Sequence, residues 1–147
     1  MNESTSASAR LAAEQLFAGD RASQQLGMRL LEVGPGQASV TMTVRPDMTN
    51  GHGICHGGFI FTLADSAFAF ACNSYGEPTV AAGASIEFLA PATLGAQLTA
   101  IARETWLGAR TGLYDITVTE AGTRVIAHMR GRSHRMARAS SQAVAKE

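Results

Sequence analysis

A chain of 147 residues with 46% hydrophobic side chains can bury a real core and is too short for several large domains, so we expect one domain spanning residues 1–147. Twelve lysines and arginines balance twelve aspartates and glutamates, so net charge neither favours nor excludes a polyanionic partner. Cys55 and Cys72 are too few for a disulfide framework, and the polar start of the chain is no secretory signal; both observations favour a soluble, cytoplasmic protein.

Three elements are expected before residue 46. Residues 9–19 combine good helix formers with three large apolar side chains, and Gly19 is a suitable terminator, so this segment predicts a short amphipathic helix. Residues 28–33 and 38–44 are predicted strands joined by a turn at residues 34–36. Apolar and polar side chains alternate in the second strand, which indicates that one of its faces is buried.

Residues 56–74 form an almost wholly apolar segment that contains one acid, Asp65. This composition is typical of a helix surrounded by protein. The segment is shorter than the roughly 20 residues of a membrane span and has a carboxylate at its centre, so we exclude a span. Burying a carboxylate without partners costs on the order of several kcal/mol, which indicates a chemical role for Asp65.

Four more strands are expected after a turn at residues 75–78. They cover residues 80–89, 97–106, 111–119 and 123–134, with turns between them. Two strands, one buried helix and four further strands predict an α+β domain whose antiparallel sheet curls around the helix. We expect the core to span about residues 15–136, with flexible ends: the first few residues and the tail after about residue 138.

The apolar segment opens with the pair Gly57-Gly58. The first N–H groups of a helix lack partners within it and lie at the positive end of its dipole. Glycines leave this backbone open to a carbonyl oxygen, as in an oxyanion hole. Taken alone, a Gly-Gly pair favours a simple tight turn.

The separation of Gly57 from Asp65 has a consequence for the assembly of the site. On one continuous helix, eight residues correspond to roughly 12 Å along the axis. A carbonyl and the water that attacks it need both groups within about 3–3.5 Å of the reaction. We therefore infer a two-fold dimer in which the helix start of one chain faces the acid of its partner, giving two composite sites.

Other polar residues precede the helix. The spacing of His52, Cys55 and His56 lacks the second ligand pair of a structural zinc site, so we expect no metal. A Cys55–His56 nucleophile pair is disfavoured because sequence neighbours rarely face each other correctly. We expect His56 to orient the loop or the substrate carbonyl and His52 to be an ordinary loop residue. Asn50 either holds a water or the substrate carbonyl, or shapes an Asn-Gly turn.

Two basic segments can bind phosphate groups. Residues 106–112 carry Arg110, the hydroxyl of Thr111 and two glycines. Residues 124–138 contain five arginines, two histidines and no acid. A decorated turn and a solvated strand face are the alternatives, and both stay open.

Several motifs occur together in this chain: Asn50-Gly51-His52, Cys55-His56-Gly57-Gly58, Leu63-Ala64-Asp65, Ala71-Cys72-Asn73-Ser74, Ile86-Glu87-Phe88-Leu89-Ala90-Pro91, Thr111-Gly112-Leu113-Tyr114-Asp115-Ile116 and Arg130-Gly131-Arg132-Ser133-His134-Arg135. In this combination, over about residues 15–136, the chain resembles the hot-dog-fold acyl-CoA thioesterases, most closely the phenylacetate-degradation (PaaI-type) family.

The resemblance implies hydrolysis of an aryl- or acyl-coenzyme A thioester, such as phenylacetyl-CoA or a ring-hydroxylated form. It makes Asp65 the general base or nucleophile and the Gly57 N–H the group that polarises the thioester oxygen, with help from His56 and Asn50. The residues implied in substrate or CoA binding are Gly58, Phe88, Gly108, Arg110, Thr111, Ser133 and His134. Some relatives carry a serine near the start of the strand after the central helix, where this chain has Val80-Ala81-Ala82-Gly83.

The resemblance also implies a homodimer with shared active sites, arranged as a dimer of dimers, and no cofactor, because coenzyme A is part of the substrate. The alternatives are a non-catalytic acyl-CoA-binding regulator and a hot-dog dehydratase. No helix-turn-helix candidate precedes the core, so we expect neither a DNA-binding regulator nor any nucleic-acid or membrane partner. Dehydratase signatures differ from His-Gly-Gly with a downstream Leu-Ala-Asp, which favours the thioesterase.

Overall fold

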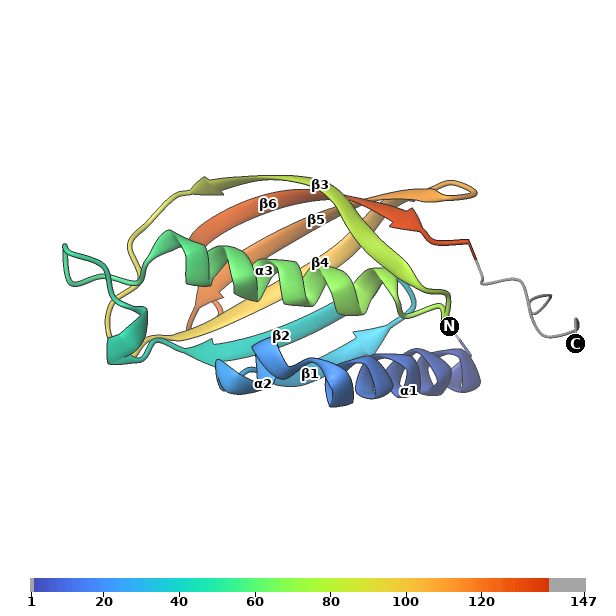
Figure 1. The fold of residues 1–147 in the computed structure, drawn as a ribbon, viewed down its shortest axis with the longest axis horizontal. Helices are drawn as coiled ribbons and strands as arrows, with labels where there is room; N and C mark the ends of the chain where they lie inside the picture. The colour runs from blue at the N-terminus through green and yellow to red at the C-terminus, as the bar shows by residue number, and fades with distance from the viewer. Residues whose placement is uncertain (1, 138–147) are drawn as a thin grey trace, which may run out of the picture.

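The computed structural model describes residues 2–137, which form one six-stranded antiparallel sheet wrapped around a long helix (Figure 1). The strand order across the sheet is β1-β2-β4-β5-β6-β3. This arrangement confirms the predicted α+β fold with a sheet curled around a central helix. No helix among the described residues is long and apolar enough to cross a membrane.

The N-terminal helices lie along the β1 side of the sheet (Figure 1). Helix α1 spans Glu3–Gly19 and begins at the N-cap Asn2, so the predicted start at residue 9 was wrong, whereas the predicted end at Gly19 is confirmed. Its residues Ala9 and Ala13 are buried, so packing as well as propensity stabilises the helix. A second short helix, α2 at Arg21–Gln25, was not predicted; Asp20 caps it.

All six predicted strands are present, with ends shifted by at most two residues. They are β1 at Arg29–Gly34, β2 at Gln37–Thr43, β3 at Thr79–Phe88, β4 at Gln97–Leu107, β5 at Thr111–Glu120 and β6 at Arg124–Arg135. In β5 the residues Tyr114, Ile116 and Val118 are buried and alternate with positions that are partly exposed and, except for Leu113, polar. This period of two confirms that one face of the sheet packs on the core while the other faces outward.

The central helix, α3 at Gly57–Cys72, fills the concave side of the sheet (Figure 1). Nine of its side chains are buried, which explains why nearly every position of this segment is apolar. Helix α3 packs closely against β6 at Gly131, where an added Cβ would lie 2.7 Å from the ring of the fully buried Phe68. Glycine at this position therefore lets sheet and helix approach each other.

Strand β3 is the edge strand next to β6, and most of it is exposed. It is a long edge, built largely from alanine, glycine and serine between Ala81 and Ser85. The backbone groups on its outer side have no neighbouring strand among the described residues. Such an edge is a template for pairing with another chain.

Candidate active site

The first turn of α3 offers one free backbone donor. His56 is the N-cap, and its Nδ1 accepts a hydrogen bond from the N–H of Gly58 at 2.9 Å. The N–H of Phe59 donates to the carbonyl oxygen of His56 at 3.0 Å. Among residues 2–137 no group accepts from the N–H of Gly57. The two glycines of the motif therefore differ: Gly58 is committed to the cap, and Gly57 is available to a ligand.

The cap also fixes the histidine. Because Nδ1 of His56 accepts from a backbone N–H, the proton of the neutral ring is on Nε2. The backbone N–H of His56 donates to the carbonyl oxygen of Met48 at 2.7 Å, which holds the start of the helix against the preceding turn. The expected orienting role of His56 within the loop thus takes the form of helix capping, with an exposed ring that retains one N–H donor.

Gly57 lies in the wall of an open groove of about 490 Å³. The other lining residues are Asn50, Ile54, Cys55, Ile60, Phe88, Leu89, Ala90 and Pro91. The ring of Phe88 leans on Gly57, because a Cβ at that position would lie 3.0 Å from its Cζ atom. The groove is mostly apolar, with a backbone donor and one amide side chain in its wall, which is the composition of a small-molecule site.

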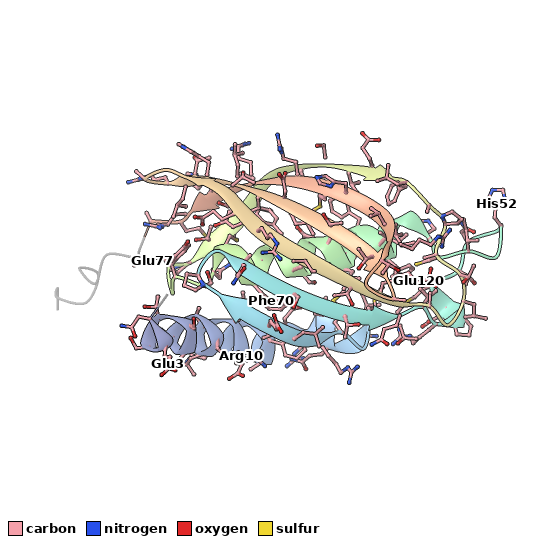
Figure 2. The ribbon with its side chains drawn as sticks, turned by 180° about the vertical axis from the view of Figure 1, so that it is seen from behind. Glu3, Arg10, His52, Phe70, Glu77 and Glu120 are labelled. Atoms are coloured by element: carbon pink, nitrogen blue, oxygen red, sulfur yellow. The ribbon has the colours of Figure 1, made fainter. Side chains whose placement is uncertain are left out.

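Asn50 shapes the loop before the helix and also lines the groove; its role toward a water or the substrate carbonyl stays a prediction. Its Oδ1 accepts from the N–H groups of His52, at 2.9 Å, and Ile54, at 3.3 Å, so the side chain shapes the loop before the helix. The residue also lines the groove, and its Nδ2 donates to no acceptor within the described part of the chain. His52 lies at the tip of this loop and points away from the rest of the molecule (Figure 2).

Asp65 is half-buried and unpaired. Within residues 2–137 its carboxylate has neither a hydrogen-bond donor nor a cation. The chain's other three aspartates are all paired: Asp20 with Ser23, Asp47 with Arg45 and Asp115 with Arg130. Burial raises the pKa of Asp65 above its ordinary value, and the negative charge of Asp20 raises it further. An unpaired acid with a raised pKa is typical of a functional group.

Gly57 and Asp65 lie on the same continuous helix, as the shared-site prediction assumed. Eight residues separate them, or roughly 12 Å along the axis. Asp65 is not among the residues that line the groove beside Gly57. A single chain therefore does not bring the donor and the acid to one reacting carbon.

A second set of predicted residues gathers at the opposite end of α3. The hairpin between β4 and β5 and the end of β6 lie there, near the C-terminus of the helix (Figure 1). Thr111 pairs with His134, and the N–H of Gly108 donates to the carbonyl oxygen of Thr111 at 2.8 Å. Arg110 and His134 are exposed, whereas Ser133 is buried and its hydroxyl donates to the carbonyl oxygen of Gly112 at 3.5 Å.

Several arginines of the predicted basic strip are engaged within the protein. Arg130 binds Asp115 through two hydrogen bonds, of 2.9 and 3.2 Å, and lowers the pKa of that carboxyl. Arg124 contacts Glu120 and the carbonyl oxygen of Pro91, and Arg132 donates to the carbonyl oxygen of Ala82. The strip is therefore largely a strand face with internal partners; Arg138 lies outside the described residues.

Sequence reasoning missed the surroundings of Asp65. The hydroxyls of Ser23 and Ser66 lie 2.7 Å apart, and Ser23 also donates to the carboxylate of Asp20 at 2.6 Å. The signal for part of this cluster was present, because Asp20 follows the helix terminator Gly19 and stands three residues before a serine, as helix caps do. Its contact with α3 spans 43 residues and has no local signature.

Comparisons with known proteins agree with this geometry. Residues 52–127 match the model of the thioesterase superfamily. The chain is 44% identical over 124 residues to the acyl-coenzyme A thioesterase PaaI of Escherichia coli, covering 84% of this chain and 89% of that protein.

Two solved structures extend the comparison. That of E. coli PaaI, described as a protein of the phenylacetic acid degradation operon, superposes with a TM-score of 0.89 at 42% identity and covers 90% of this chain and 96% of that one. A Streptococcus mutans protein solved with bound acetyl-CoA has a TM-score of 0.71 at 28% identity, covering 74% and 88%. The chain therefore belongs to the thioesterase superfamily, in the hot-dog-fold, PaaI-type branch, and is a thioester hydrolase.

Proposed function

We propose that the protein hydrolyses an aryl- or acyl-CoA thioester, with phenylacetyl-CoA or a ring-hydroxylated form as the preferred substrate. The observation that carries this proposal is that α3 has two unpaired polar groups among the described residues: the N–H of Gly57 at its start and the carboxylate of Asp65 in its middle. The first suits a developing oxyanion and the second an attacking water. The likeness to a PaaI thioesterase supports the substrate class.

In the proposed reaction the thioester oxygen accepts from the N–H of Gly57. Asp65 takes a proton from water, whose oxygen bonds to the carbonyl carbon, or its carboxylate attacks that carbon directly. The carbon–sulfur bond then breaks, and the sulfur leaves with the bonding electrons. In the first route the proton held by Asp65 passes to the coenzyme A thiolate. In the second route water hydrolyses the mixed anhydride formed with Asp65, which releases the acid, restores the carboxylate and supplies the proton to coenzyme A. A thiolate is a good leaving group, so this reaction needs no metal or other cofactor. A raised pKa makes the ionised Asp65 carboxylate a stronger base.

The groove beside Gly57 is the proposed site of the acyl group. Its apolar lining includes Ile54, Ile60 and the half-exposed ring of Phe88, which can pack against an aryl ring. Asn50 brings its free amide N–H₂ to the same groove and can hold the carbonyl or the water. His56 fixes the helix start from which Gly57 donates.

A second copy of the chain completes the proposed site. Edge strand β3 has ten residues, small side chains and an unpaired outer side, so it can pair with the same strand of another copy about a two-fold axis. This pairing places two α3 helices side by side on one continuous sheet, with Asp65 of one chain toward Gly57 of the other. Assembly of two such dimers into a tetramer is part of the proposal.

The exposed cluster at the β4–β5 hairpin is the proposed contact for the coenzyme A nucleotide. Arg110 can bind a phosphate, and the hydroxyl of Thr111 is a further polar group next to it in the hairpin, which the hydrogen bond from the Gly108 N–H to the Thr111 carbonyl oxygen closes. His134 pairs with Thr111 on the neighbouring strand. Ser133 is buried, and its hydroxyl supports the cluster by donating to the carbonyl oxygen of Gly112.

The test measures coenzyme A release with a thiol reagent, using phenylacetyl-CoA, a ring-hydroxylated analogue, acetyl-CoA and a long-chain acyl-CoA. We expect the aryl substrates to give the highest kcat/KM and Asp65→Asn to lose about 10²–10⁴-fold in kcat, the usual contribution of a general base. Asp47→Asn is the matched control, because Asp47 is exposed and pairs with Arg45. Turnover of Asp65→Asn at the rate of the unmodified protein would remove this residue from the mechanism, and preference for an aliphatic substrate would contradict the proposed specificity.

A further inference from the structure

A chain of three polar side chains joins the corner between α1 and α2 to the central helix, beside Asp65. Asp20 accepts from the backbone N–H of Ser23 at 3.0 Å and from its hydroxyl at 2.6 Å. The hydroxyl of Ser23 lies 2.7 Å from that of Ser66. Ser23 and Ser66 are both buried, with exposed fractions of 1% and 8%. The two hydroxyls therefore form a buried polar contact between α2 and α3.

The direction of the chain follows from the donors available. An ionised carboxylate only accepts, so the single proton of the Ser23 hydroxyl is committed to Asp20. The hydroxyl of Ser66 must therefore be the donor in the contact with Ser23. A serine inside a helix commonly bonds the carbonyl four residues earlier, but this one is turned toward α2 instead.

The contact between Ser66 and Ser23 affects the orientation of the neighbouring residue, Asp65. Because successive helix residues are about 100° apart, pinning Ser66 toward α2 fixes the direction in which Asp65 leaves the helix. The hydroxyl of Ser66 is also unavailable to the Asp65 carboxylate, which keeps both oxygens free.

The negative charge of Asp20 also acts on Asp65. Burial raises its pKa, and among the charged groups on the elements around α3, Asp20 is the one whose field raises it further. On α3 itself, Asp65 interacts electrostatically with Cys72. Burial and the charge of Asp65 raise the pKa of the Cys72 thiol to about 12, although a backbone hydrogen bond lowers it, so the thiol is neutral at pH 7.

We propose that Asp20 is a positioning residue for the reaction: through the hydroxyls of Ser23 and Ser66 it sets the orientation and the electrostatic environment of Asp65. This inference rests on the proposed role of Asp65 as base or nucleophile. A carboxylate that only capped α2 would not need a buried hydroxyl bridge to another helix. The negative charge of Asp20 also disfavours ionisation of Asp65.

The experiment compares Asp20→Asn, which removes the charge and keeps an acceptor, with Ser66→Ala, which breaks the bridge and keeps the charge. Asp47→Asn loses the same charge at a site that does not act on Asp65. For each protein the Asp65 carboxyl is titrated by ¹³C NMR, with Asp65→Asn to assign its signal, and kcat and KM are measured against pH. Thermal unfolding of each variant is recorded in parallel.

In Asp20→Asn we expect the Asp65 titration and the acid limb of kcat/KM to move together to lower pH, with both unchanged in Asp47→Asn. In Ser66→Ala we expect kcat to fall about 10-fold at unchanged KM, because small misplacement of a reacting group is costly. Variants that lose only stability, with the Asp65 titration and kcat unaltered, would overturn the inference. If Asp20→Asn does not fold, the kcat of Ser66→Ala decides. Because the NMR titration reads Asp65 directly, this outcome is separate from whether Asp65→Asn abolishes hydrolysis.

Discussion

The two adjacent glycines at the start of α3 should respond differently to the same substitution. A methyl group at Gly57 would lie 3.0, 3.3 and 3.4 Å from three atoms of the Phe88 ring, so it would fill the space between the helix start and that ring. Carbon atoms prefer about 3.5–4.0 Å, so the ring must move by roughly half an ångström. Phe88 is 53% exposed on an edge strand and can move, so we expect little change in the free energy of unfolding.

The cost of Gly57→Ala should instead appear in the rate. The methyl group occupies the wall of the groove where a thioester oxygen has to approach the N–H. Loss of one oxyanion donor costs about 10²–10³-fold in kcat, and this is the upper limit that we expect for the variant.

Gly58→Ala is the matched comparison. Its methyl group would lie 3.1 Å from Nδ1 of His56, the atom that accepts from the Gly58 N–H, so the substitution strains the cap. Loss of a cap costs about 0.5–2 kcal/mol of stability. We therefore expect Gly57→Ala to lower kcat with stability nearly unchanged, and Gly58→Ala mainly to lower the denaturant midpoint. Steady-state CoA release and urea unfolding measure the two effects. The reverse pattern would refute the assignment of Gly57 as the donor.

Two further variants test the environment of Asp65 and the packing of α3. The folded-state pKa of Asp65 is raised above its ordinary value of about 4, so the ionised side chain lowers the stability of the fold at neutral pH. Asp65→Asn should therefore be more stable than the unmodified protein in urea at pH 7, and this difference should vanish as the pH falls below about 4. Equal stability of the two proteins at both pH values would contradict the raised pKa. Gly131→Ala should lose about 1–3 kcal/mol, because its Cβ would lie 2.7 Å from the buried Phe68 ring, whereas Gly19→Ala, with no atom within 4 Å of the added Cβ, should not.

Much of the fold could be predicted because its signals are local. The alternation in β5 and the length of the apolar segment at α3 identified those elements within two residues of their ends. The start of α1 was missed because the serine-rich residues before Ala9 are weak helix formers, and the helix is continued there by the Asn2 cap and by packing. The strand order, with β3 outside β6, depends on contacts far apart in sequence and has no comparable signal.

The candidate site likewise has features that a local sequence signal predicts and features that it does not. Asp65 could be singled out because a lone acid in an apolar helix is chemically conspicuous, and its lack of a partner in the described chain agrees with that reasoning. The difference between Gly57 and Gly58 could not be predicted, because it depends on which N–H the His56 ring accepts from. The contact between Ser23 and Ser66 depends on the docking of α2 against α3, which a single sequence does not encode locally.

Exchange of subunits between two inactive variants tests the shared site most directly. Asp65→Asn keeps Gly57, and Gly57→Val keeps Asp65, so a mixed dimer contains one site with both groups intact and one site with neither. Random mixing makes half of the dimers mixed, so activity should return to about a quarter of that of the unmodified protein. Native mass spectrometry of differently tagged subunits measures the mixed fraction. Recovery to about that level is the predicted result; confirmed mixed dimers that release no coenzyme A would contradict a site built from two chains.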